Sequence, residues 1–308
     1  MCERTFTAMG TEATLIIDTA RCDDAERTVR GIYERVTRAM SPWIETSDVS
    51  RINRGGGKPV VIGDETFSLL ERAVLGSRRT DGLFDVTFAS LGEVWSFKET
   101  VVPRLPDPSA LRARLALVDY RKVTLDAEAK TVSLGDPRVR VSLNGIAKGY
   151  AVDAAAAALR ASGARDFLLR LGGDLYAAGT RGARPWKVAI RDPRALDRTF
   201  AELDVRDAAF STSGDYERFF MSGGKRYHHI IDPRTGYPAT ASRSVTMLCK
   251  DATSAEVLSK AIFIAGHTAL DRLLADSGCD AVIVDQAGLV HTSRGVQGKL
   301  VMLGAPAR

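Results

Sequence analysis

The sequence predicts a protein of the α+β class. Alternating apolar stretches, which are typical of strands, are interspersed with helical patterns in an irregular order. A parallel sheet would instead need a strict alternation of strands and helices. No internal repeat or low-complexity tract interrupts the 308 residues. A chain of this length can bury a large core, either as one domain or as two fused lobes.

The first half of the chain contains two clear helical patterns. Asp23 and Asp24 open a helix that continues to Met40, because its apolar residues recur at helical spacing. Residues 65–78 show the same pattern. Other segments predict a buried strand at 12–18, a hairpin formed by 123–125 and 131–134, and a Pro-rich surface connection at 98–110.

The second half begins with a change from strand to helix. Residues 138–143 alternate like a strand, and an Ala-rich helix follows Asn144 and Gly145, with Gly163 as its C-cap. Further predicted elements are a buried strand with a glycine break at 167–179, strands at 186–190, 244–248, 281–285 and 299–303, and helices at 254–266 and 267–276.

The composition is that of an average globular protein. Hydrophobic residues make up 45% and charged residues 26%, which excludes collagen-like and disordered chains. A net charge of +5 spread over 308 residues produces only a weak electrostatic field. Because no basic stripe or helix-turn-helix pattern is present, nucleic-acid binding is not expected.

The four cysteines are far apart in the sequence, at positions 2, 22, 249 and 279. Without a Cys-x-x-Cys pair they predict neither a zinc site nor a redox motif, and we expect four unrelated thiols. No apolar run approaches the length of a membrane span. The first residues lack the apolar region of a signal peptide. The sequence as it stands therefore predicts a cytoplasmic protein, or a periplasmic lipoprotein if a leader preceding Cys2 has been removed.

Residues 142–150, SLNGIAKGY, predict a strand that enters a helix through a glycine turn. The N-terminus of a helix presents backbone N–H groups and a positive dipole to an anion. Lys148 in the first helical turn is unfavourable unless an anion shares the site. A phosphate site and an ordinary strand–helix turn are both compatible with this pattern.

Two further segments contain polar residues within apolar patterns. The glycine pair Gly172–Gly173 before Asp174 is typical of a β-bulge or of a backbone that approaches a ligand closely. Residues 210–216, FSTSGDY, suit hydrogen bonds to a polar ligand and equally suit a turn. On the predicted helix at 254–266, Glu256 and Lys260 are spaced as a surface ion pair.

The last segment, residues 227–238, contains two of the four histidines of the chain. Neighbouring residues of a strand face opposite sides, so His228 and His229 cannot both face one site. A zinc pair is therefore not expected, whereas one histidine can act as a general base. Residues 232–236, DPRTG, predict a tight turn.

Taken together and in order, these segments resemble the FAD:protein FMN transferase family, known as ApbE. The resemblance covers residues 9 to about 266. The matching stretches are MGT at 9–11, MSPW at 40–43, SDVSRIN at 47–53, DGLFDVT at 81–87, WSF at 95–97, NGIAKGYAVD at 144–153, LGGD at 171–174, TSGDY at 212–216 and residues 228–236.

This resemblance implies an α+β fold related to the T-fold, in one domain or in two fused lobes with FAD between them. It also implies an activity: the protein splits the pyrophosphate of FAD, attaches FMN by a phosphoester to a Thr or Ser hydroxyl of a target protein, and releases AMP. Members of the family generally need Mg²⁺.

The resemblance also assigns roles to individual residues. His229 matches the catalytic histidine, and the backbone carbonyl of Gly145 matches a metal ligand. The residues that match FAD contacts, or that stand beside the metal and FAD sites, are Met9, Trp43, Phe84, Asp85, Ser142, Lys148 and Ile230. Among these, Trp43 stands where the family has an aromatic ring that stacks on FAD.

The sequence departs from the family at the metal site. The family's metal-binding helix usually reads Asp-Ala-x-x-Thr, whereas residues 256–260 read Glu-Val-Leu-Ser-Lys. Glu256 still offers a carboxylate, but Lys260 replaces a hydroxyl ligand by an ammonium, which has no lone pair to give a metal. Ser142 stands where the family commonly has Asp. These residues supply the octahedral oxygen coordination of Mg²⁺ poorly.

Two outcomes follow from this departure. In the first, Lys260 replaces Mg²⁺ as the counter-charge of the pyrophosphate, and transfer proceeds with little dependence on metal. In the second, the chain binds FAD without transfer, or hydrolyses it to FMN and AMP. The presence of His229, Lys148 and residues 212–215 favours a catalyst.

Overall fold

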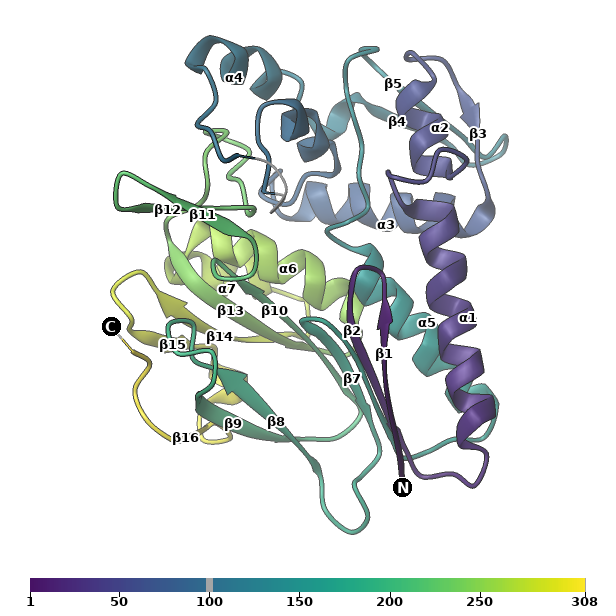
Figure 1. Cartoon of the computed structure of the whole chain (residues 1–308), viewed down its shortest axis with the longest axis vertical. Helices are drawn as coiled ribbons and strands as arrows, with labels where there is room; N and C mark the ends of the chain where they lie inside the picture. The colour runs from purple at the N-terminus through teal and green to yellow at the C-terminus, as the bar shows by residue number, and fades with distance from the viewer. Residues whose placement is uncertain (98–101, 308) are drawn as a thin grey trace. The chain divides into compact units, whose positions relative to one another are not determined.

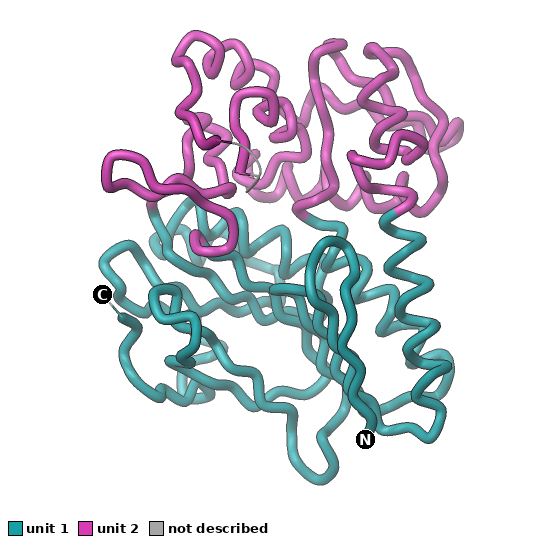
Figure 2. Tube along the Cα trace, in the orientation of Figure 1, with its two compact units in different colours: residues 1–37, 146–214, 241–308 teal, residues 38–145, 215–240 magenta. Residues whose placement is uncertain are grey.

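The computed structural model describes residues 1–97 and 102–307 and contains two compact units, shown in Figure 2. Unit 1 comprises residues 1–37, 146–214 and 241–308, and unit 2 comprises residues 38–145 and 215–240. Both units combine helices with antiparallel strands, which confirms the predicted α+β class. The start of the predicted Pro-rich connection, residues 98–101, lies outside the described residues.

Unit 1 is built on an eight-stranded sheet in which all neighbouring strands are antiparallel (Figure 1). In spatial order its strands are β1 (Cys2–Ala8), β2 (Thr11–Ile17), β6 (Phe167–Leu171), β7 (Asp174–Ala178), β10 (Ala208–Gly214), β13 (Ser242–Cys249), β14 (Asp280–Asp285) and β15 (Val290–Thr292).

Both faces of this sheet are covered, and strands β2, β6 and β14 are accordingly rich in apolar residues. Helices α5 (Ala147–Ala161) and α6 (Ala252–Ala265) pack on one face, over β7, β10 and β13. A small sheet formed by β8 (Trp186–Arg191), β9 (Thr199–Val205) and β16 (Val301–Met302) covers the other face. There Trp186 and Phe200 pack with Phe210 of β10 in one apolar core.

The remaining helical elements of unit 1 are short or lie at its ends. Helix α1 (Cys22–Met40) begins in unit 1, where the ring of Tyr33 contacts Phe6 of β1. After α6 the chain forms η3 (His267–Ala269), α7 (Leu270–Leu274) and η4 (Arg294–Val296). Among the described residues, no helix has both the length and the apolar character needed to cross a bilayer.

All four cysteines lie in unit 1 and form two disulfides, Cys2–Cys22 and Cys249–Cys279, so the prediction of unrelated thiols was wrong. The pairing follows from the strand register. Leu248 of β13 lies opposite Asp280 of β14, which brings the preceding Cys279 next to Cys249. The spacing of the cysteines in the sequence does not predict this strand register.

Unit 2 has smaller elements. They are α2 (Asp48–Arg54), α3 (Asp64–Arg79), η1 (Val86–Glu93), α4 (Pro108–Leu115), η2 (Tyr120–Lys122), the sheet of β3 (Val60–Val61), β5 (Thr131–Leu134) and β4 (Val123–Asp126), and the hairpin of β11 (Phe219–Ser222) and β12 (Lys225–His228).

The β4–β5 hairpin and the tight turn at residues 232–236 confirm two predictions. Trp95 fixes that turn, because its indole N–H donates to the Gly236 carbonyl at 2.7 Å.

The strand predicted at residues 138–143 does not form. The side-chain amide of Asn53 donates to the Val141 carbonyl at 2.9 Å and accepts from its N–H at 2.8 Å. One side chain thus supplies the two hydrogen bonds that a neighbouring strand would have made. The segment therefore belongs to no sheet.

The single broken strand predicted at residues 167–179 is in fact two strands. Gly172 and Gly173 form the two-residue turn of a hairpin, in which Leu171 of β6 pairs with Asp174 of β7. Gly172 has a φ of 60°, which glycine adopts without strain. The turn reverses the chain and brings Asp174 under helix α5.

Helices α5 and α6 approach each other closely because position 149 is glycine. A Cβ atom at Gly149 would lie 2.4 Å from the Ala252 carbonyl oxygen. Beside this contact Asp153 of α5 accepts hydrogen bonds from the first N–H groups of α6, Ala252 at 2.7 Å and Thr253 at 2.9 Å. Asp153 therefore fixes the start of α6 against α5.

We predict a pH-dependent contribution of Asp153 to stability. Burial raises its pKa from 3.8 to about 6, against the opposing effect of its hydrogen bonds from Thr253 and Ala252. Between these values the folded chain binds more protons than the unfolded chain, so this group makes the free energy of unfolding fall as pH rises. Asp153→Asn should remove that fall. Urea unfolding of both proteins at several pH values from 4 to 7 measures this difference. If the free energy of unfolding changes with pH in the same way in both proteins, Asp153 does not make the predicted contribution.

Candidate functional site

Side chains from four of the segments singled out above meet in unit 1, at the first turn of helix α5. They are Lys148 of α5, Asp174 of β7, Ser211 and Ser213 of β10, and Glu256, Ser259 and Lys260 of α6. Because these residues lie far apart in the sequence, only the packing of α5 and α6 on the sheet brings them together.

The Glu256 carboxylate lies at the centre of this cluster, and its side chain is 1% exposed. Its Oε2 accepts from the Gly149 N–H at 2.8 Å, and its Oε1 accepts from Lys148 Nζ at 2.9 Å and Lys260 Nζ at 3.3 Å. The predicted ion pair between Glu256 and Lys260 forms, but its carboxylate is buried rather than on the surface, since α5 packs against this face of α6.

The second carboxylate, Asp174, is 3% exposed and shares Lys148 with Glu256. Its Oδ2 lies 3.2 Å from Lys148 Nζ, and its Oδ1 accepts from the Ser211 hydroxyl at 2.6 Å. Ser213 bonds to Ser259 at 2.9 Å on the same face of β10. Residues 208–214 are thus a strand that presents hydroxyls to the helices, and a turn follows at Asp215 and Tyr216, so the predicted stretch 210–216 contains both.

The two lysine side chains are the accessible part of the cluster. The Lys148 side chain is 30% exposed and that of Lys260 is 24% exposed, whereas both carboxylates are buried. A ligand that approaches from solvent therefore meets positive charge above a buried negative layer. Such a surface suits an anion with several oxygen atoms.

The pKa directions follow from this layering. Burial raises the pKa of Asp174, and the neighbouring Glu256 raises it further. For Glu256, burial acts in the same direction, but Lys148 and Lys260 outweigh it and hold its pKa below the usual range. The carboxylates likewise outweigh the effect of burial on Lys148 and raise its pKa, so this lysine stays charged. Burial lowers the pKa of Lys260.

Met9, which the resemblance assigns to the flavin, also belongs to unit 1. It forms the tight turn between β1 and β2 together with Gly10, and Ala8 pairs with Thr11 across this turn. Its φ is 49°, a left-handed conformation that is uncommon for residues other than glycine.

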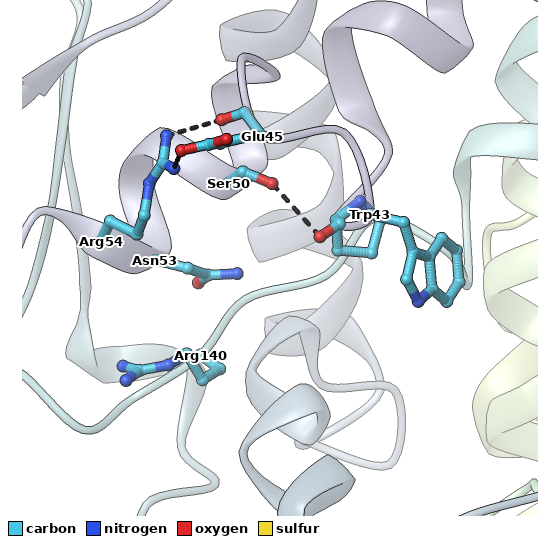
Figure 3. A pocket seen from close by; sticks show the side chains of 7 residues that line it. Trp43, Glu45, Ser50, Asn53, Arg54 and Arg140 are labelled. Atoms are coloured by element: carbon cyan, nitrogen blue, oxygen red, sulfur yellow. Dashed lines mark hydrogen bonds and ion pairs between the residues drawn. The ribbon is translucent and has the colours of Figure 1, made fainter.

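Trp43, another predicted flavin contact, lies in unit 2 and is 67% exposed, as a ring that stacks on a ligand requires. It borders a shallow pocket in which Arg54 bonds to Glu45 at 2.7 Å. Figure 3 shows its indole projecting away from this ion pair. The other residues that line the pocket are Pro42, Ser50, Asn53 and Arg140.

The other assigned residues of unit 2 are buried. Phe84, Ser142 and Ile230 are each less than 9% exposed, and Gly145 is buried in a turn. Asp85 accepts from Thr87 N–H at 2.7 Å and from Tyr120 N–H at 2.8 Å, so in this structure it caps the helix η1. Burial raises its pKa, although these hydrogen bonds oppose the shift. The contacts of Phe84, Asp85, Ser142 and Ile230 with FAD remain predictions.

The two histidines of unit 2 differ in exposure, although β12 ends at His228 and His229 lies outside the strand. His228 is buried: its Nε2 lies 2.9 Å from the Ala239 carbonyl, and its Nδ1 accepts from the Ile230 N–H at 3.3 Å. Both ring nitrogens are thus used within the fold. His229 is partly exposed, and its Nδ1 lies 3.3 Å from the Arg218 carbonyl. The catalytic role of His229 stays a prediction that this difference supports.

The residues at the α5 site do not fit a magnesium ion. Magnesium needs about six oxygen ligands at about 2.1 Å. Here both oxygens of Glu256 are occupied by N–H donors, and two ammonium groups stand where ligands would have to be. A divalent cation next to them would be repelled. Among the described residues, the group whose ligand atoms lie close enough for a metal is instead His267, Asp285 and His291, elsewhere in unit 1.

Sequence reasoning missed several parts of this site. Asp174 belongs to a stretch that matches the family, but this match gives it no role, and no sequence pattern points to the Gly149 amide or to Ser259. A signal for Asp174 was available, because an acidic residue directly after a glycine turn in an otherwise apolar segment needs a partner. The hydrogen bonds of Gly149 and Ser259 depend on helix packing, which no local pattern encodes.

Comparison with known proteins identifies the family of this chain. The sequence model of the ApbE family matches residues 9–283. The FAD:protein FMN transferase of Treponema pallidum is 35% identical over 294 residues, covering 89% of this chain and 80% of the relative. That of Haemophilus influenzae is 32% identical over 258 residues, covering 81% and 75%.

Two solved structures have the same fold. The ApbE protein of Thermotoga maritima superposes with a TM-score of 0.90 at 32% identity and covers 97% of this chain and 98% of its own. The flavin transferase ApbE of Vibrio cholerae superposes with a TM-score of 0.85 at 26% identity and covers 97% and 98%. The family match spans well over half of the chain and the relatives are aligned over most of their length, so this chain belongs to the ApbE family.

Proposed function

We propose that this protein is an FAD:protein FMN transferase, which moves FMN from FAD to a Ser or Thr hydroxyl of another protein. Its membership of the ApbE family and the names of its relatives support this activity. The observation in the structure that carries it is the pair of partly exposed lysine side chains at the first turn of α5, whose ammonium groups contact two buried carboxylates. This arrangement suits the pyrophosphate of a dinucleotide.

The reaction is a phosphoryl transfer. The acceptor oxygen forms a bond to the phosphorus of the FMN half, and the bond from that phosphorus to the bridging oxygen breaks. AMP leaves with the bridging oxygen, and the acceptor hydroxyl loses its proton. Catalysis therefore needs positive charge near the phosphoryl oxygens and a base near the hydroxyl.

Lys148 and Lys260 supply the positive charge. Lys148 keeps its charge because Asp174 and Glu256 both stabilise the ammonium form. The first turn of α5 adds the positive end of the helix dipole. Together these groups compensate the negative charge that moves to the bridging oxygen as AMP departs.

His229 is the proposed base. A neutral imidazole that donates through Nδ1 to the Arg218 carbonyl has its basic lone pair on Nε2. His228 cannot take this role without breaking bonds to Ala239 and Ile230. The proposed partner is a protein with an acceptor segment of the Asp-Gly-x-Ser/Thr-x-Thr type.

This function is tested by incubating the protein with FAD and a domain that carries such a segment. We expect the mass of the domain to increase by that of one FMN phosphoester, and AMP to appear in equal amount. AMP without a change in mass would indicate hydrolysis, and bound FAD with neither product would indicate a flavin-binding protein; both outcomes contradict the proposal.

His229→Ala should retain FAD binding and lose transfer by about 10²- to 10⁴-fold, because only proton removal is impaired. Intact-protein mass spectrometry of the acceptor domain measures the rate, and flavin fluorescence measures binding. Lys225→Ala, which changes an exposed residue of the nearby strand β12, is the control that should keep full activity. An unchanged rate of transfer by the His229→Ala variant would show that His229 is not the base.

The two disulfides also support a proposal about the compartment. Such bonds persist in oxidising environments and are rare in the reducing cytosol. Cys249–Cys279 ties β13 to the start of β14, so its reduction would loosen the sheet that carries β10 and α6. We therefore favour an oxidising compartment such as the periplasm over the cytoplasm.

Protein purified without reductant should resist alkylation of all four cysteines, even in urea, until a reductant is added. Reduction should lower the free energy of unfolding by about 2–4 kcal/mol for each bond. Peptide mapping after alkylation identifies the pairs. Free thiols in the unreduced protein would contradict both the pairing and the proposed compartment.

A further inference from the structure

The α5 site already contains the cations that its carboxylates need. Glu256 and Asp174 are buried, and buried carboxylates require compensating charge. Lys148 contacts both of them, and Lys260 contacts Glu256. Two negative groups are thus balanced by two positive groups of the same chain, which leaves no uncompensated negative charge to attract a divalent ion.

Lys260 is held in place by its own helix. It lies one turn after Glu256 on the face of α6 that packs toward α5. Its Nζ lies 3.3 Å from Glu256 Oε1 and 3.2 Å from the Glu256 backbone carbonyl oxygen. These two contacts fix the ammonium beside the first turn of α5 rather than in solvent.

Both ammonium groups retain capacity for a ligand. Within the described part of the chain, Lys148 uses two of its three N–H donors, on Glu256 and Asp174. Lys260 likewise uses two, both on Glu256. Each lysine side chain is partly exposed, and one N–H donor on each is not used by these contacts.

We propose that the ammonium of Lys260 takes the place of a divalent cation, so that this chain binds the pyrophosphate of FAD through Lys260 and Lys148 and needs no Mg²⁺. This inference rests on the proposed function, since it specifies how the substrate of that reaction is held. It follows from the contacts of Glu256, whose two oxygens already accept hydrogen bonds from N–H donors.

The binding test compares FAD affinity in EDTA and in millimolar Mg²⁺, followed by quenching of flavin fluorescence. The wild-type dissociation constants should agree within about twofold in the two conditions. Lys260→Met, which removes the charge and offers no oxygen, should weaken binding by about 10- to 100-fold in both, as expected for loss of a charge-assisted hydrogen bond.

Lys260→Thr provides the sharper comparison, because it puts a hydroxyl oxygen one turn from the Glu256 carboxylate. It should bind FAD as weakly as Lys260→Met in EDTA but recover most of its affinity in Mg²⁺. Lys250→Thr removes an exposed lysine just before α6 and should behave like the wild type. Thermal unfolding of each variant identifies any loss that comes from misfolding.

A second readout needs no flavin chemistry. When Mn²⁺ is added to the wild-type protein with FAD, its electron paramagnetic resonance signal should equal that of Mn²⁺ with FAD and no protein. With the Lys260→Thr variant, the signal of free Mn²⁺ should be lower, because the variant binds the ion. Wild-type FAD binding that is lost in EDTA, or a folded Lys260→Met variant with unchanged affinity, would overturn the inference.

The two proposals fail separately. A wild-type protein that binds FAD equally well in EDTA but modifies no acceptor would refute the transferase activity and leave the cation replacement intact. Transfer that occurs only with Mg²⁺ would support the transferase activity and refute the cation replacement.

Discussion

The carboxylate of Glu256 sets the constraint on which the α5 site depends. A charged group with almost no access to water must be paired and hydrogen-bonded, or its burial costs several kcal/mol. Here the partners are one backbone N–H and two ammonium groups, supplied by Gly149, Lys148 and Lys260. Gly149 can approach only because it lacks a side chain, so the close crossing of α5 and α6 and the pairing of Glu256 require each other.

The same constraint reaches into the sheet. Lys148 also contacts Asp174, which the glycine turn between β6 and β7 brings under the helix. A Cβ at Gly173 would lie 2.8 Å from the Thr212 carbonyl oxygen, so glycine is needed for β7 and β10 to stay paired at this point. The glycines that interrupt apolar patterns in the sequence are therefore positions where backbone segments touch, and the charges gather around them.

Local patterns predicted most of the elements but not their contacts. The helix from Asp23 to Met40 and the hairpin of β4 and β5 were foreseen, because each repeats its apolar period within one continuous stretch. The strand at 138–143 failed because Asn53, far away in the sequence, takes the hydrogen bonds of Val141. The disulfides and the burial of Glu256 were missed for the same reason: both arise from pairing between distant segments.

A lysine that serves as the site's cation differs physically from a bound metal ion. It is covalently attached, so its charge is present at any concentration of Mg²⁺, but an ammonium carries half the charge and cannot accept a lone pair from the substrate. The second lysine compensates in part, since Lys148 and Lys260 together equal the charge of one divalent ion. That charge is spread over two nitrogens bonded to one oxygen of Glu256, and a pyrophosphate likewise spreads its charge over two phosphoryl groups. The small net charge of the whole chain therefore says little about its chemistry, whereas the placement of two lysines over two buried carboxylates defines what the site can bind.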